Sequence, residues 1–181
     1  MRSVADIDWD GWEARDPATL VFVIRDDHIL LIRKKRGLGH GKVNGPGGKL
    51  DPGEDAVTCA ARECEEELGI RVRELECMGE HRFQFLDGYS IHCWVFRTSE
   101  YEGEPVETAE AVPLWTRIEE IPNDEIWEDD RIWLPMVIAG QPFSARWIFD
   151  DDRMLDYKLD QVKQVTPGGR RRARESTHDT A

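Results

Sequence analysis

The chain has 181 residues, a net charge of −13 and an apolar content of 40%. This length suits one domain with its own core, and the seven tryptophans exclude a wholly disordered chain. No apolar run approaches the roughly 20 residues of a membrane helix, and the negative charge argues against stable nucleic-acid binding. We expect a monomer with no membrane association, located in the cytoplasm because the acidic start of the chain lacks an export signal.

Composition divides the chain into three regions. Residues 1–16 are an acidic N-terminal extension, residues 17–165 carry the apolar patterning of one domain, and residues 166–181 are a basic C-terminal tail. The tail contains "RRRAR" but no apolar periodicity, so we expect it to be flexible. A short basic run could also bind nucleic acid, but on so acidic a chain solvated disorder is the simpler interpretation.

A β-hairpin followed by a glycine-rich loop is predicted first. Residues 19–25 and 28–34 are β-rich runs separated by Asp26–Asp27. Residues 36–54 then contain seven glycines and two prolines. A stretch of this composition is typical of a loop in which the backbone can approach a ligand closely.

Residues 54–68 have the spacing of an amphipathic helix. Gly69 is expected to end this helix in the left-handed conformation that glycine favours. The predicted buried face consists of Val57, Ala60, Ala61, Cys64 and Leu68.

Further strands and one more helix are predicted in the rest of the chain. Asp87–Gly88 is expected to turn a hairpin, and Pro135 must lie in the first turn of the second helix or bend it. The strands are predicted over residues 72–79, 81–88, 89–98 and 111–118, with a final pair over residues 145–162, and the helix over residues 127–140.

The first predicted helix has an unusual density of acidic residues. Glu63, Glu66 and Glu67 lie three and four residues apart and therefore share one face. Like charges at this spacing cost only about 0.2–0.5 kcal/mol per pair, so a solvated acidic face is one interpretation. Carboxylates grouped in this way are also hard oxygen ligands for Mg²⁺ or Mn²⁺. The neighbouring glycine-rich loop and the basic residues 33–37 favour a metal site for phosphoryl transfer.

Residues 48–70, "GKLDPGEDAVTCAARECEEELGI", resemble the Nudix box, G-x5-E-x7-R-E-U-x-E-E-x-G-U, where U is aliphatic. Cys64 at the first U position is a soft departure from this pattern. The matching positions are Gly48, Glu54, Arg62, Glu63, Glu66, Glu67, Gly69 and Ile70. The resemblance implies a Nudix hydrolase with an α+β fold, a mixed β-sheet sandwiched between α-helices, and Mg²⁺ (or Mn²⁺) as cofactor.

The resemblance also implies roles by position. Glu63 and Glu67 are expected to ligate the metal, and Glu66 to be a third ligand or to orient the attacking water. Arg62 and Glu54 are expected to form a salt bridge that fixes the loop against the helix.

Two residues outside the box also match family positions. Gly47 is expected to offer its carbonyl to a metal. Glu110, in "PVETAEAVPLW", matches a position that binds metal or serves as the general base, which must lie within reach of water. The alternative for Glu110 is an exposed acid in a surface loop.

The flanks of the box resemble Nudix hydrolases that act on oxidised purine nucleoside triphosphates, over about residues 19–162. This likeness places Asn44, Asp129 and Asp130 on the hydrogen-bonding edges of the purine. The other expected substrate-binding residues are Trp127 and Phe83 beside the ring, Thr19, Phe85, Ile91 and Trp133 around it, and Lys34 on phosphate.

Simpler interpretations remain open for several of these residues. Asp129 and Asp130 are also typical of a helix N-terminus. Phe83 and Phe85 alternate as in any half-buried strand, and Asn44 is typical of a turn.

The predicted activity is hydrolysis of a small-molecule nucleotide. An oxidised purine nucleoside triphosphate, such as 8-oxo-dGTP or 2-hydroxy-dATP, would give a monophosphate and pyrophosphate, which cleanses the nucleotide pool. A second hypothesis keeps the chemistry but changes the substrate to ADP-ribose, a dinucleoside polyphosphate or a cap-like nucleotide. A third is a non-catalytic nucleotide sensor, which would be expected to lose box glutamates, whereas none is missing.

Overall fold

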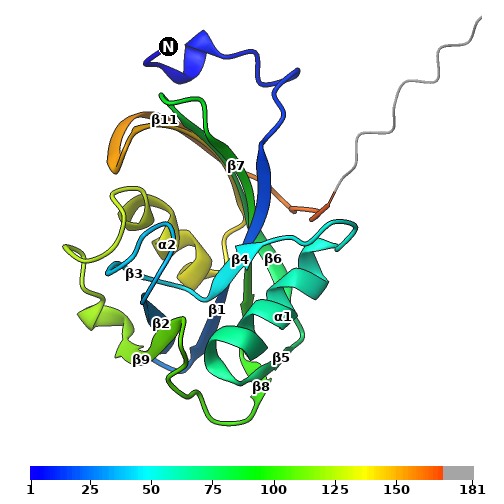
Figure 1. Ribbon diagram of the computed structural model, residues 1–181, viewed down its shortest axis with the longest axis vertical. Coiled ribbons are helices and arrows are strands. Elements are labelled where there is room, and N and C mark those ends of the chain that lie inside the picture. Colours follow the sequence, from blue (N-terminus) through cyan, green and yellow to red (C-terminus); the bar gives the residue numbers. More distant parts are fainter. Residues whose placement is uncertain (169–181) are drawn as a thin grey trace, which may run out of the picture.

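The computed structural model describes residues 1–168, in which a mixed β-sheet separates two helices (Figure 1). Helix α1 (Ala56–Leu68) covers one face of the sheet and helix α2 (Asp130–Ala139) covers the other. The predicted α+β architecture, a mixed sheet between helices, is therefore confirmed. No helix within the described residues is long and apolar enough to cross a membrane.

The sheet has nine strands, seven of which run in the order β11-β10-β6-β7-β1-β2-β3, while β4 pairs with β1 and β9 with β2. A separate two-stranded sheet joins β5 to β8. The bounds are β1 (Asp16–Arg25), β2 (His28–Lys34), β3 (Val43–Asn44), β4 (Gly47–Lys49), β5 (Arg71–Arg73), β6 (Glu76–Phe85), β7 (Ser90–Thr98), β8 (Glu100–Glu102), β9 (Ala111–Arg117), β10 (Phe143–Asp150) and β11 (Arg153–Gln161), with short 3-10 helices η1 (Val4–Asp6) and η2 (Ile118–Glu120).

Strands β1 and β2 form the predicted hairpin, and Asp26 in its turn takes a φ of 52°. Two pairings in the sheet are parallel, β1 with β7 and β10 with β6. Both connect segments that are distant in sequence, so they could not be read from local patterning. They place the ends of β1, β6, β7 and β10 around one hollow on the α2 side of the sheet.

Strand β6 corrects the prediction of separate strands over residues 72–79 and 81–88. It runs without a break from Glu76 to Phe85, with a register shift between Cys77 and Gly79 opposite β7. A side chain at Gly79 would collide with the ring of Phe143. Glycine at this position therefore marks a close packing contact inside a strand and not the end of the strand.

Helix α1 begins after Asp55, whose side chain accepts a hydrogen bond from the amide of Thr58 (2.8 Å), and it ends at Gly69 with φ 71°. The prediction that Val57 is buried was wrong, because its side chain is 45% exposed. The buried face is rotated toward Ala56 and Cys59 and includes two glutamates of the box. A pattern that counts only apolar residues misplaces the face when buried positions carry functional acids.

Helix α2 contains Pro135 in its interior, beyond the first turn. Gly140 caps it with φ 73°. Trp133 and Val137 are fully buried and pack in the cluster that lies between α2 and the sheet. This cluster forms the floor beneath the hollow described below.

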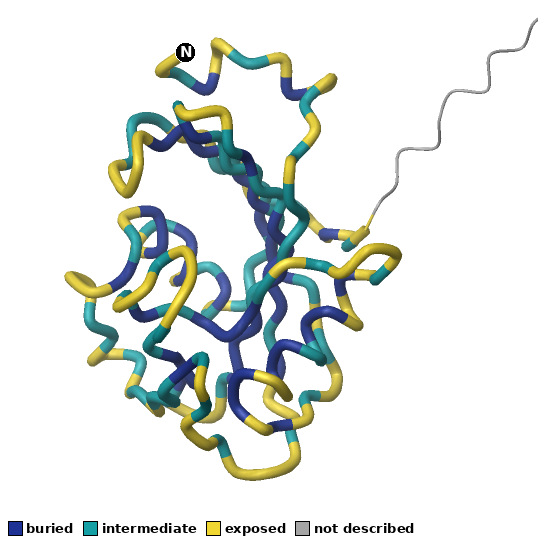
Figure 2. Tube along the Cα trace, viewed as in Figure 1, coloured by how far each residue is buried: buried dark blue, intermediate teal, exposed yellow. Residues whose placement is uncertain are grey.

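The N-terminal segment, residues 1–15, is folded onto the sheet rather than extended from it (Figures 1 and 2). Val4 and Trp9 are buried against Ile148 of β10, and the indole of Trp9 donates to the carbonyl of Val4 (2.8 Å). At the other end, residues 169–181 lie outside the described part of the chain. The expectation of a flexible basic tail there stays a prediction.

Candidate active site

Three carboxylates converge beside the glycine strand β4. Glu63 and Glu67 come from α1 and Glu110 from the residue before β9, and each offers an oxygen within 4.8 Å of the others. Glu63 and Glu67 are buried, whereas Glu110 is half-buried. The structure thus brings together an acid of the loop before β9 with two acids of the helix. A local sequence pattern alone could not establish this contact.

Burial raises the pKa of the Glu63 carboxyl, and it raises the pKa of Glu67 to about 8 against the opposing effect of the Lys34 ammonium. The cause is desolvation, which disfavours carboxylate charge in apolar surroundings. A divalent cation would remove this penalty. Three carboxylates, with open coordination left for water and phosphate, suit Mg²⁺ or Mn²⁺, both of which prefer hard oxygen ligands.

Arg62 lies at the centre of a set of charge-assisted hydrogen bonds. Its Nε and Nη2 each donate to the carboxylate of Glu54 at 2.8 Å, which is the salt bridge expected from the sequence. This pairing lowers the pKa of Glu54 to about 2. Arg62 Nη1 also donates to Glu63 (2.9 Å), and Nη2 donates to the carbonyl of Lys49 (3.1 Å). The guanidinium therefore ties the loop, β4 and a candidate metal ligand into one unit.

Glu66 occupies a different position from the three converging acids. Its side chain is about half exposed and accepts a hydrogen bond from Arg62 Nη1 at 3.1 Å. It stands outside the group formed by Glu63, Glu67 and Glu110. The role expected for Glu66, as a third ligand or as the group that orients water, therefore stays a prediction.

Close packing explains the glycines of β4. A side chain at Gly47 would collide with the carbonyl of Thr19, and one at Gly48 would collide with the carboxylate of Glu63. The amide of Gly47 lies 3.4 Å from Glu67 Oε2, so the main chain of β4 runs beside the candidate metal ligands. The expectation that the Gly47 carbonyl binds a metal stays a prediction.

The basic residues at the end of β2 and directly after it have different partners. Lys34 lines the hollow and acts electrostatically on Glu67. Lys35 pairs with Glu107, and Arg36 pairs with Glu110. Among residues 1–168, Lys34 is thus the member of this run that forms no such ion pair and lines the hollow, and its contact with phosphate stays a prediction.

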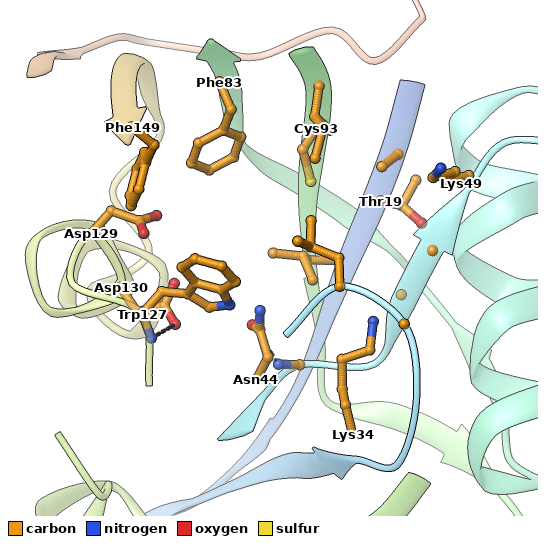
Figure 3. A pocket seen from close by; sticks show the side chains of 18 of the residues that line it. Thr19, Lys34, Asn44, Lys49, Phe83, Cys93, Trp127, Asp129, Asp130 and Phe149 are labelled. Carbon is orange, nitrogen blue, oxygen red and sulfur yellow. Dashed lines mark hydrogen bonds between the residues drawn. The ribbon is translucent and has the colours of Figure 1, made fainter. Parts of the chain in front are cut away.

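A cavity of about 680 Å³ extends from β4 to the start of α2 (Figure 3). It contains all ten residues that the sequence placed in the substrate site: Thr19, Lys34, Asn44, Phe83, Phe85, Ile91, Trp127, Asp129, Asp130 and Trp133. The same strand β4 lies at the cavity and beside the carboxylates. A ligand could therefore present an aromatic group to one region and phosphates to the other.

Asp129 and Asp130 are buried where α2 begins. Asp129 Oδ2 accepts a hydrogen bond from the indole Nε1 of Trp133 (2.8 Å), and Asp130 Oδ2 accepts one from the amide of Trp127 (3.1 Å). Asp129 occupies the N-cap position of α2, as the simpler interpretation expected, but its side chain makes no hydrogen bond that caps the helix. Burial raises the pKa of both carboxyls, and the proximity of Asp129 raises that of Asp130 further.

Aromatic rings line the cavity next to this acid pair. Trp127 meets Phe149 edge-on with centroids 6.0 Å apart, and Phe83 lies 6.1 Å from Phe149. Lys42 stacks over Trp127 at 5.0 Å from the ring centroid. The rings leave an apolar slot suited to a flat base, whose polar edge would meet the buried acids.

Asn44 shows that a turn role and a pocket role can coexist. Its Oδ1 accepts a hydrogen bond from the amide of Gly45 (2.7 Å), as the simpler interpretation required, yet its side chain also lines the cavity. Thr19 reaches the cavity with its Oγ1 3.4 Å from the thiol of Cys59.

The lining residues that sequence reasoning missed include Lys49, Tyr89, Cys93 and Phe149. Phe149 lies opposite Phe85 because β10 pairs in parallel with β6. The sequence predicted a final strand pair over residues 145–162 but not the strand beside which residue 149 lies. Lys49 adjoins the box glycines, and that adjacency was the one available signal for it.

Comparison with known proteins agrees with this geometry. Residues 14–137 match the family model of the NUDIX domain, and the chain belongs to the Nudix family of hydrolases. It is similar to the oxidized purine nucleoside triphosphate hydrolase of Danio rerio, with 38% identity over 81% of this chain and 96% of that one. The Mus musculus enzyme of the same name is 36% identical over 80% of this chain and 94% of its own length.

Among solved structures, the crystal structure of a MutT protein from Bacillus halodurans is similar, with a TM-score of 0.73. Its sequence is 26% identical, and the match covers 80% of this chain and 97% of that protein. The chain is therefore a Nudix hydrolase with a Nudix fold. Enzymes of this family act on small nucleotide derivatives and are typically dependent on divalent metal, in keeping with the grouping of Glu63, Glu67 and Glu110.

Proposed function

We propose that this hydrolase is a Mg²⁺-dependent pyrophosphohydrolase that converts oxidised purine nucleoside triphosphates to monophosphates and pyrophosphate. The observation that carries the proposal is the pair of buried acids, Asp129 and Asp130, inside an aromatic cavity. The similarity to two oxidized purine nucleoside triphosphate hydrolases supports the same substrate class.

The acid pair suits an oxidised purine for a chemical reason. Oxidation at C8 adds a carbonyl and turns N7 from an acceptor into an N–H donor, while the lactam and amino edge still needs partners. Two adjacent carboxyls with raised pKa values can share one proton, so the pair both donates and accepts. Asn44 adds an amide that also supplies both functions. More than one modified purine would find matching partners here.

The carboxylates would hold the metal that the reaction requires. Glu63, Glu67 and Glu110 are the residues placed to bind Mg²⁺, which would neutralise phosphate charge and acidify a bound water. Arg62 fixes Glu63 in position through its 2.9 Å hydrogen bond, and Lys34 is placed to bind phosphate oxygens.

Water would then attack the β-phosphorus. A bond forms from the water oxygen to the β-phosphorus. The bond from the β-phosphorus to the oxygen that it shares with the α-phosphorus breaks, and that oxygen remains on the monophosphate. The water proton passes to a carboxylate, for which Glu66 and Glu110 are the two candidates. Glu110 lies among the converging acids and Glu66 at their rim.

A pyrophosphate-release screen with Mg²⁺ tests the proposal. It should cover normal and oxidised purine triphosphates together with ADP-ribose and dinucleoside polyphosphates, ranked by kcat/KM. We expect oxidised purine triphosphates to lead. A clear preference for ADP-ribose or a dinucleoside polyphosphate would replace this substrate assignment, and an inactive chain would favour a nucleotide sensor.

We further propose that the enzyme works as a monomer in the cytoplasm. The four cysteines are free thiols, which is the usual state in a reducing compartment. Size-exclusion chromatography with light scattering tests the oligomeric state, and fluorescence microscopy of the tagged chain tests the location. A stable dimer or a localised organellar signal would contradict these two proposals.

A further inference from the structure

One wall of the cavity is the turn between β6 and β7. Phe85 at the end of β6 and Tyr89 just before β7 both line the cavity. The turn between them is closed by its own main chain, since the amide of Phe85 donates to the carbonyl of Tyr89 at 2.9 Å. Gly88 within it takes a φ of 93°. A short turn at the ends of two strands needs support from outside if its side chains are to hold one position against a ligand.

That support comes from the N-terminal segment, residues 1–15. The indole Nε1 of Trp12 donates to Gln84 Oε1 at 2.8 Å. The amide group of Gln84 in turn donates to the carbonyls of Phe85 (3.1 Å) and Tyr89 (3.0 Å), which are the two ends of the turn. Trp12 is thus connected to the cavity wall through the side chain of Gln84.

A second connection lies immediately after this segment. Asp16, the first residue of β1, accepts hydrogen bonds at Oδ2 from the hydroxyl of Tyr89 (2.7 Å) and the ammonium of Lys49 (2.9 Å). Arg15 lies over the Tyr89 ring at 5.7 Å, and its amide donates to Ser90 Oγ (2.9 Å). Tyr89 and Lys49 are both lining residues, so this contact joins the wall to the strand that carries the box glycines.

We propose that the N-terminal segment, together with Asp16 that directly follows it, is a positioning element of the nucleotide cavity. Through Trp12 and Gln84 the segment holds the β6–β7 turn, and through Asp16 the same turn is connected to Lys49, another lining residue. Nucleotide affinity then depends on residues that touch no substrate. This inference rests on the proposed nucleotide function and adds a determinant of affinity outside the Nudix box.

The chain contains a matched pair of tryptophans for the test. Trp12→Phe removes the indole hydrogen bond to Gln84, while Trp9→Phe removes one of the same 2.8 Å length to Val4 within the segment itself. For Trp12→Phe we expect KM to rise about threefold to tenfold, the effect of losing one hydrogen bond, with kcat unchanged. Trp9→Phe should leave KM within about twofold of the wild type. A purely structural role would lower the active fraction, and hence kcat, at constant KM.

Two further measurements make the outcome decisive. Isothermal titration with the nucleoside monophosphate product should show the same loss of affinity for Trp12→Phe without any turnover. Asp16→Asn should raise KM as well, whereas Asp156→Asn, which releases Ser3 and Val4 far along the same segment, should not. Thermal melting of each variant identifies loss of folding, and Asp16→Asn carries the test if Trp12→Phe fails to fold.

The possible results separate the two proposals. An active wild type whose Trp12→Phe and Asp16→Asn variants keep its KM overturns the positioning role alone. Equal losses in Trp12→Phe and Trp9→Phe overturn it too, because they indicate general destabilisation. A wild type that hydrolyses a different nucleotide derivative overturns the proposed substrate. The positioning role is then tested by measuring the KM of the variants on that derivative. A wild type that neither hydrolyses nor binds any of the nucleotides overturns both.

Discussion

Arg62 donates two hydrogen bonds, each 2.8 Å long, to the carboxylate of Glu54, and this pair fixes the loop before α1 to the helix. The same guanidinium also donates to Glu63 and to the carbonyl of Lys49. The candidate metal ligand and strand β4 are therefore held by one side chain. Because Nε and Nη2 of the planar guanidinium bind Glu54 at a fixed geometry, the ammonium group of a lysine cannot replace the Arg62 guanidinium.

Arg62→Lys should therefore lower kcat/KM by about tenfold or more, since a single ammonium group cannot reproduce the directed hydrogen bonds of the guanidinium. The Mg²⁺ concentration for half-maximal activity should rise, because Glu63 loses its support. Arg71→Lys is the matched control, as Arg71 meets Glu65 at 3.5 Å on an exposed surface. Steady-state kinetics with a Mg²⁺ titration measures both effects. Wild-type kinetics in Arg62→Lys would contradict the bracing role.

Glu110 can be tested against its neighbour Glu107. Both are paired with a basic residue after β2, Glu110 with Arg36 and Glu107 with Lys35, but Glu110 alone of the two lies in the carboxylate group. Glu110→Gln should lower kcat at least about tenfold, whether Glu110 binds metal or accepts the proton. Glu107→Gln should leave kcat near the wild-type value. Near-normal turnover in Glu110→Gln would show that Glu110 is an ordinary surface acid with no role in catalysis.

Asp129 should determine which purines are accepted. In Asp129→Asn only one carboxyl of the pair remains, so the pair can no longer share a proton. The ratio of kcat/KM for 8-oxo-dGTP to kcat/KM for dGTP should therefore change by at least about fivefold. Glu128→Gln, which alters an exposed neighbour, should preserve that ratio. Competition assays with both nucleotides measure it directly. An unchanged ratio in Asp129→Asn would remove Asp129 from base recognition.

Asp130 should also make stability fall as pH rises. Burial raises its folded-state pKa well above the unfolded value of about 3.9. The folded chain then keeps a proton that the unfolded chain releases, so stability present below the unfolded pKa is lost as pH rises through the folded pKa. Asp130→Asn should therefore raise Tm by ~2 °C or more at pH 7.5, with a smaller gain at pH 4.5. A gain that is constant across this range would exclude the linkage.

The sequence predicted the local parts of the site well. The box fixed the positions of Glu54, Arg62 and the helix acids because these contacts lie within one loop and one helix. Glu110 required likeness to the family, since its approach to α1 depends on where the loop before β9 is placed. Residues of the cavity were predicted by the same likeness.

Long-range pairing accounts for most of what was missed. Phe149 enters the cavity through the parallel pairing of β10 with β6, and Tyr89 and Lys49 meet through Asp16. None of these contacts leaves a periodic signal in one segment. Val57 was misplaced for a different reason, because the buried helix face accommodates Glu63 and Glu67 where an apolar pattern expects hydrophobic residues.

The parallel pairing of β10 with β6 also orders events during synthesis of the chain. The Nudix box and its helix are complete once residue 70 has been made, but the wall that contains Phe149 cannot form until β10 has emerged and paired with a strand made much earlier. Non-local pairings of this kind form slowly, because loop-closure entropy opposes them before any contact is gained. A nascent chain thus contains the complete Nudix box well before the cavity wall with Phe149 can form.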